Sequence, residues 1–124
     1  MKRTLNTHAE IQQYLHELLH TGRPGDTYAR IKHAPGVNEI IENVTGNLIS
    51  RADPGSIEVG QITNRATGIL RDRNMFWFTV RQREYAIVYS DGNIVIRDRN
   101  QWGGVVATLN NSNKDTIRTV FAGL

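Results

Sequence analysis

Apolar residues recur with a helical period in three parts of the chain. The first part follows Thr7 and Glu10, a capping box in which each side chain can bond the other residue's backbone amide, and it stops at Gly22. The second covers residues 37–44 and stops at Gly46. The third is short and follows the capping pair Ser112 and Asp115. The pattern therefore predicts two N-terminal helices and a short C-terminal helix.

From Met75 onward the apolar period changes to two, which predicts strands that are buried on one side. Four strands are expected, over residues 75–81, 85–90, 93–98 and 105–109. Short connections join them, including the hairpin turn Asp91 and Gly92, and this spacing is typical of an antiparallel meander. The sequence thus predicts an α+β fold, with N-terminal helices followed by a four-stranded twisted antiparallel sheet and a short C-terminal helix.

Length and composition limit the classes of protein that fit. A chain of 124 residues with 39% hydrophobic residues is expected to form one globular domain, residues 1–124. No apolar run of about 18 residues is present, so no membrane span is predicted, and the basic start lacks the apolar stretch of a signal peptide. The absence of cysteine excludes a disulfide framework and a thiolate nucleophile.

The positive charge is made mostly of arginine. Twelve of the fifteen basic residues are Arg, and seven of them lie between Arg65 and Arg99, where only four acidic residues occur. Arginine is the better bidentate partner for phosphate, so this segment indicates an anionic ligand, with nucleic acid as the first candidate. The alternative is a solvated charged surface with no ligand.

Histidines on the first predicted helix are the other residues with possible site chemistry. His16 and His20 share a face at a spacing of four, and His8 lies near the helix start. Neither the His-Glu-x-x-His pattern nor a third ligand accompanies them, so exposed histidines are expected rather than a metal site. No metal and no cofactor are predicted.

Residues 46–70 carry a resemblance that composition alone does not show. The segment reads GNLISRADPGSIEVGQITNRATGIL, and the order and spacing of its Gly-Asn-Leu, Pro-Gly, Ser-Ile, Asn-Arg and Gly-x-Leu elements resemble barnase-type microbial ribonucleases. In that family the segment leads from the last helix into the first strand through the base-recognition loop. The resemblance extends to the wider group of barnase-like, EndoU-like and colicin-type ribonucleases, which occur as toxin modules. It implies an endoribonuclease that needs no metal and leaves a 2′,3′-cyclic phosphate.

The resemblance places base recognition in a polar loop. Thr63, Asn64 and Arg65 match the family's loop in kind, and Gly68 supplies its flexible backbone. The family's carboxylate has no counterpart, because alanine and threonine fill that interval. Base preference is therefore left open, and the alternative is a polar loop with no role in binding.

Catalytic residues follow from the same resemblance, position by position. The family's two phosphate-binding arginines correspond to Arg81 and Arg83, and its active-site lysine corresponds to Lys32. Thr79 stands where the family has a strand glutamate, and Asn100 stands where it has a late histidine, so the general base and acid are not identified.

Three further residues complete the expected RNA surface. His33 follows Lys32 and is a candidate for acid–base chemistry, because an imidazole side chain ordinarily titrates near neutral pH. Arg97 and Arg99 alternate along a predicted strand, so we expect them beside Arg81 and Arg83 in one arginine-lined groove.

Together these features predict a metal-independent endoribonuclease toxin that acts on RNA, with tRNA as one candidate. The alternative is a catalytically inactive RNA-binding domain on the same scaffold. An inhibitor protein is disfavoured because inhibitors of basic nucleases tend to be acidic. We expect secretion or delivery into the cytoplasm of a target cell, and a small acidic immunity protein as partner.

Overall fold

The computed structural model describes residues 3–18, 36–63, 72–90, 93–99, 104–110 and 112–124. In residues 61–63, 72–75, 89–90 and 93 it describes the backbone. The elements are β1 (Arg3–Thr4), α1 (His8–Leu18), α3 (Val37–Arg51), β2 (Glu58–Thr63), β3 (Asp72–Val80), β4 (Arg83–Ser90), β5 (Asn93–Asp98), β6 (Gly104–Thr108) and α4 (Lys114–Ala122). Within these described parts of the chain, no helix is long and apolar enough to cross a membrane.

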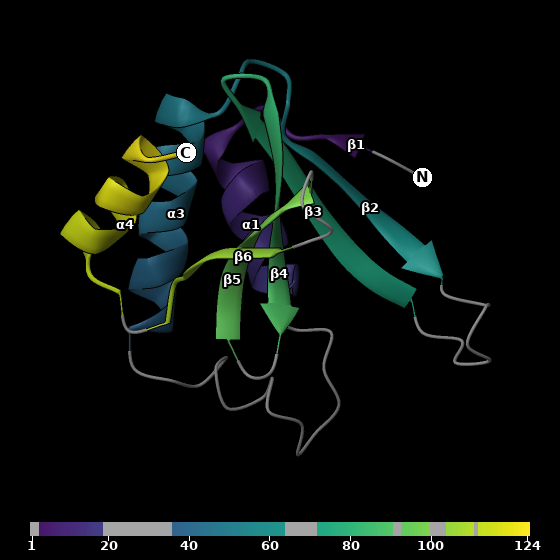
Figure 1. The fold of residues 1–124 in the computed structure, drawn as a ribbon. Coiled ribbons are helices and arrows are strands. Elements are labelled where there is room, and N and C mark those ends of the chain that lie inside the picture. Colours follow the sequence, from purple (N-terminus) through teal and green to yellow (C-terminus); the bar gives the residue numbers. More distant parts are fainter. Residues whose placement is uncertain (1–2, 19–35, 64–71, 91–92, 100–103, 111) are drawn as a thin grey trace.

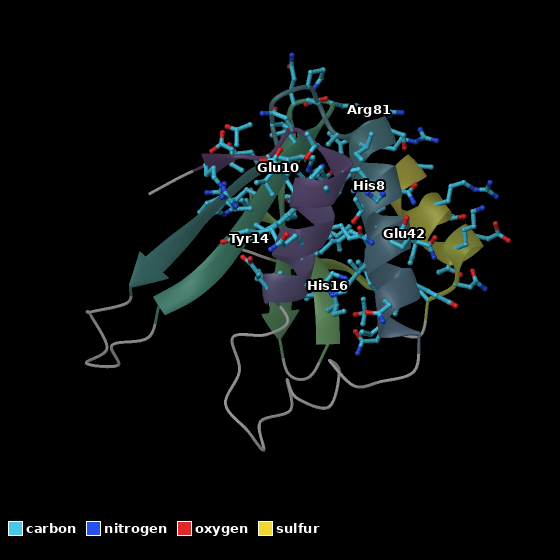
Figure 2. All side chains as sticks on the ribbon, turned by 180° about the vertical axis from the view of Figure 1, so that it is seen from behind. His8, Glu10, Tyr14, His16, Glu42 and Arg81 are labelled. Carbon is cyan, nitrogen blue, oxygen red and sulfur yellow. The ribbon has the colours of Figure 1, made fainter. Side chains whose placement is uncertain are left out.

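All six strands form one sheet in the order β1-β2-β3-β4-β5-β6, and every neighbouring pair is antiparallel. The helices cover one face of this sheet, which we call the inner face (Figure 1, Figure 2). Figure 1 is seen from the opposite side, the outer face, and Figure 2 from the side of the helices. The molecule is thus a two-layer structure with its core between helices and sheet.

The α+β class, the antiparallel sheet and the short closing helix are confirmed, but the expected number of four strands is wrong. The two additional strands precede the predicted meander. β2 pairs with β3 over its whole length, although Gly60 weakens its strand pattern. β1 is two residues long and pairs Arg3 with Val59, so no periodicity could have predicted it.

Local capping explains where the helices begin. Thr7 Oγ1 accepts a hydrogen bond from the Glu10 amide at 3.2 Å, and Glu10 Oε1 accepts one from the Thr7 amide at 3.2 Å, as the capping box predicts. At α4 the expected cap, Ser112, is wrong by one residue. The cap is Asn113, whose side-chain oxygen accepts from the Thr116 amide at 2.8 Å.

Aromatic residues join the sheet to α4. Phe78 of β3 is buried and stacks on Tyr85 of β4, with 5.6 Å between ring centroids, and on Phe121 of α4, with 5.9 Å. Tyr14 of α1 packs against Phe76 at 6.4 Å on the β2 side of the same face. The closing helix is therefore part of the core.

A carboxylate holds the loop after α3 against the β3–β4 hairpin. Asp53 Oδ2 accepts from the Thr79 hydroxyl at 2.7 Å and from the Gln82 amide at 2.8 Å, and Oδ1 accepts from the Arg81 amide at 3.1 Å. In return the Asp53 amide donates to the Thr79 carbonyl at 2.8 Å. These bonds, first the one from the Thr79 hydroxyl and then the one from the Gln82 amide, lower the pKa of Asp53.

We expect Phe121→Ala to lower the free energy of unfolding by about 3–5 kcal/mol, because it removes a fully buried ring from the stack on Phe78. The matched control is Arg118→Ala in the same helix. Arg118 is exposed and forms an ion pair with Asp115 one turn away in the same helix, so its removal should change stability by less than about 0.5 kcal/mol. Urea unfolding of both variants measures the difference. Equal stabilities would show that α4 is not part of the core.

The hydrogen bonds that Asp53 accepts predict that the free energy of unfolding depends on pH. Since the pKa of this carboxyl is lowered in the folded state, its stabilisation is fully present above the unfolded pKa and is lost as pH falls through the folded pKa. Asp53→Asn should therefore lower the unfolding free energy at pH 6 and have a much smaller effect near pH 3. Urea titrations of the two proteins at both pH values test this. A difference that is the same at both pH values would contradict the role of the ionised carboxylate.

Candidate nucleic-acid interface

Strand alternation puts a distinct set of residues on the outer face. Phe76, Phe78 and Val80 of β3 point into the core, so Trp77 and Thr79 lie on the other side. The register continues this row across the sheet. Trp77 faces Ala86 of β4, and Ala86 faces Arg97 of β5.

Arg99, directly after β5, lies over Trp77. Its guanidinium carbon is 5.1 Å from the centroid of the indole ring, and the side chain is 38% exposed. Trp77 itself is 8% exposed, so the ring supports the arginine and does not project into solvent. A cation held on an aromatic face has less rotamer freedom than one in solvent, so the Trp77 ring restricts the position of the Arg99 guanidinium.

Glu84 places a carboxylate next to this arginine. It lies directly opposite Thr79 in the β3–β4 register, and its Oε2 is 3.9 Å from Nη1 of Arg99. The Glu84 side chain is 54% exposed, so this ion pair is a weak one. Glu58 of β2, half-buried and opposite Trp77, is a second carboxylate on the same face.

Arg97 completes the cationic part of the outer face. It is half-buried, and the small Ala86 stands between it and Trp77 in the register. On its other side Arg97 pairs with Val105 of β6, next to a β-bulge between Ile96 and Arg97. Such a bulge bends a strand and increases its twist, and Figure 1 shows β6 running crosswise to β5.

The expected groove of four arginines on one face does not form. Arg83 pairs with Asp98, which is 3% exposed and alternates with Arg97, so this ion pair lies on the inner side of the sheet. Arg81 lies in the turn between β3 and β4, at the end of the molecule where α3 ends (Figure 2). The physical reason is the period of two: neighbouring positions of a strand point to opposite faces, and a turn residue belongs to neither.

Thr79, the candidate at the position of the family's glutamate, is engaged with the loop after α3. Its hydroxyl donates to Asp53, its amide donates to Ser56 Oγ at 3.2 Å, and its carbonyl accepts from the Asp53 amide. The residue opposite it in the β3–β4 register is Glu84. In the sequence Glu84 stands out only as one of the four acidic charges between Arg65 and Arg99, and the two-residue turn at 81–82 is what places it opposite Thr79.

Several candidates lie outside the residues that the structure describes. They are Lys32, His33, Asn64, Arg65, Gly68 and Asn100. Of Thr63 the structure gives the backbone, which ends β2 and pairs with Asp72. The base-recognition loop and the lysine thus stay predictions from the resemblance.

The two described histidines lie on the helix side, away from the outer face (Figure 2). His8 Nε2 is 3.4 Å from Glu42 Oε1 and so joins α1 to α3 at the surface. His16 is half-buried on α1, and its predicted partner His20 is not described. Over the described ranges, no group of three His, Cys, Asp or Glu residues could hold a metal ion.

Comparison with protein-family models finds no match for this chain, and comparison with curated protein sequences finds none either.

The positions of Arg99 and Trp77 predict how much each side chain contributes to the free energy of unfolding. Arg99→Gln should change the unfolding free energy by less than about 1 kcal/mol, because Arg99 is a partly exposed side chain with one weak ion pair. Trp77→Ala should lower it by about 3–5 kcal/mol, because the ring is buried. Thermal or urea unfolding measures both. A large loss for Arg99→Gln would mean that this arginine serves the fold rather than a ligand.

Proposed function

We propose that this protein is a metal-independent endoribonuclease of the toxin-module kind, and that RNA binds across the outer face of its sheet. One observation carries the binding part: Arg99 lies over Trp77 with its side chain 38% exposed, and Arg97 lies in the same row of the sheet as Trp77. Phosphate is the anion that a planar guanidinium fork binds best, and a nucleic-acid strand offers it repeatedly. The resemblance in residues 46–70 favours RNA over other polyanions.

Glu84 supports the cleavage part. In this proposal its carboxylate takes the proton of a 2′-hydroxyl, the freed oxygen attacks the neighbouring phosphorus, and the bond to the 5′-oxygen breaks. Arg99, 3.9 Å from Glu84, stabilises the charge that develops on the phosphoryl oxygens. The products are a 2′,3′-cyclic phosphate and a 5′-hydroxyl, whose proton comes from a general acid. Lys32, His33 and Asn100 remain candidates for the acid and for phosphate contacts.

A catalytically inactive RNA-binding domain is the second candidate function. It is favoured by the position of both described histidines on the helix side, because neither can act as an acid at the outer face. Cleavage of a labelled RNA in EDTA separates the two functions. Product with a cyclic phosphate supports the enzyme, whereas retarded but intact RNA supports the binding domain.

Partner and location follow as parts of the same proposal. A ribonuclease delivered into the cytoplasm of a target cell has to be silenced where it is made. A small acidic inhibitor that covers the outer face would do so, and opposite charges would speed its association.

We expect Arg99→Gln to weaken binding of a single-stranded RNA about tenfold at low salt, since one charge-assisted phosphate contact is lost. Arg118→Gln is the control, because it removes the same charge from α4 on the other side of the sheet. Fluorescence anisotropy of a labelled oligonucleotide measures both affinities. Equal losses for the two variants would indicate unspecific attraction by net charge and would contradict an outer-face site.

If the protein cleaves, Glu84→Gln should reduce the cleavage rate about 100-fold or more while binding stays within a few-fold of the original. Removing a general base affects the chemical step, and removing a negative charge near phosphate does not weaken binding. Single-turnover cleavage and anisotropy measure the two quantities. Asp115→Asn, an acid on α4, is the matched control. Full activity of Glu84→Gln would assign the base elsewhere.

A further inference from the structure

The two edges of the described sheet differ in composition and length. β1, at one edge, has two residues, and one of them is an arginine. β6, at the other edge, has five residues, Gly104–Thr108, with neither a charge nor a proline among them. Proteins commonly protect an edge strand by shortness, charge or proline, because its unpaired backbone can add the strand of another chain. The β6 edge lacks these three forms of protection.

Two neighbouring valines of β6 are exposed. Val105 is 54% exposed and Val106 is 44% exposed, and the third exposed large apolar side chain among the described residues is Ile49 of α3. A β-bulge lies at these valines, and regular pairing with β5 holds at Ala107 and Thr108. Single apolar side chains are normal on a protein surface, but two neighbours on an open edge strand indicate a contact.

The direction of the backbone groups decides which residues of β6 can pair outward. The Leu109 amide donates to the Ile94 carbonyl of β5 at 2.8 Å, so the backbone groups of Leu109 point toward β5. This direction alternates along a strand. The backbone groups of Ala107 therefore also point toward β5, whereas those of Val106 and Thr108 point toward the open edge.

We propose that β6 pairs with β6 of a second copy of this chain, antiparallel and centred on Ala107. In this register Val106 lies opposite the partner's Thr108, Thr108 lies opposite the partner's Val106, and the two copies of Ala107 face each other. Each Val–Thr pair uses the backbone groups that point away from β5 and exchanges both N–H···O bonds. The inference does not depend on the proposed ribonuclease function.

The composition of β6 favours a second copy as the occupant. A two-fold axis makes the antiparallel pairing self-complementary, so every contact occurs twice. Valine and threonine are β-branched and pair well across strands. β6 brings no charge to the contact, and Arg97 lies one strand behind it in each copy. Three strand spacings, about 14 Å, then separate the two arginines, which exceeds the Debye length of about 8 Å at physiological salt.

The contact is small, so the dimer should be weak. Interfaces below about 1,200 Å² belong to transient complexes, and we expect a pair of five-residue strands to fall in this class. The expected dissociation constant is about 10–100 μM. Each chain has one β6, so the pairing closes at two copies and does not continue into a fibre.

Sedimentation equilibrium of the purified protein between about 5 and 500 μM tests the dimer. We expect the average mass to rise from that of one chain toward that of two. Val106→Lys should weaken association at least about tenfold, because it places two like charges diagonally across the pair, about 7–8 Å apart. Ile49→Lys is the matched control, since it makes the same kind of change at an exposed side chain of α3. Both variants should keep the melting temperature within about 4 °C.

A single introduced cysteine tests the register, because the chain has no cysteine of its own. Ala107→Cys places the same residue of both copies face to face, at a Cα separation of about 4.5 Å, which a disulfide can bridge. On mild oxidation this variant should form a covalent dimer. Thr108→Cys is the control, because in this register it faces the partner's Val106 and should cross-link more slowly.

Each result bears on a separate part of the inference. The mass of one chain over the whole concentration range would refute the dimer. A dimer that persists in Val106→Lys, or that Ile49→Lys weakens equally, would refute the role of β6. Faster cross-linking of Thr108→Cys than of Ala107→Cys would refute the register centred on Ala107. None of these measurements involves RNA, so their failure would leave the proposed function standing.

Discussion

The two-residue turn between β3 and β4 determines which residues of this protein can act together. It pairs Phe78 with Tyr85 and Thr79 with Glu84, and a slip by one residue would move every side chain of one strand to the other face. Asp53 holds the turn through two backbone amides and one hydroxyl, so the register is fixed from outside the hairpin as well. Both the aromatic core and the outer-face site depend on this register.

The strand register also decides on which face of the sheet each charged side chain lies. Arg83 and Asp98 form an ion pair on the inner side, where the carboxylate is buried and its partner helps to offset the loss of hydration. Arg99, one residue after Asp98, reaches the outer face and lies over Trp77. Neighbouring residues of one strand end therefore serve different purposes. The Arg83–Asp98 pair stabilises the inner side of the sheet, whereas Arg99 lies partly exposed on the outer face, next to Glu84.

Sequence patterns gave the parts of this fold that periodicity controls. The amphipathic stripes of α1 and α3 and the alternation in β3, β4 and β5 follow directly from burial on one side. β1 could not be predicted, because its two residues join the sheet through backbone bonds to β2 that carry no side-chain signal. For the site, Arg97 and Arg99 were identified by charge, but their support by Trp77 and the position of Glu84 depend on pairing between strands. These contacts depend on which residues of neighbouring strands face one another, and the sequence of a single strand does not show this.

The central claim is that RNA contacts the outer face of the sheet, and side-chain NMR tests it most directly. The Nε–H resonances of the arginines and the indole N–H resonances of the tryptophans can be followed as single-stranded RNA is added. We expect the signals of Arg99, Arg97 and Trp77 to shift together and saturate, while those of Arg51 at the end of α3 and Arg118 on α4 stay in place. Shifts confined to Arg51 and Arg118, with the outer-face signals unchanged, would contradict the claim.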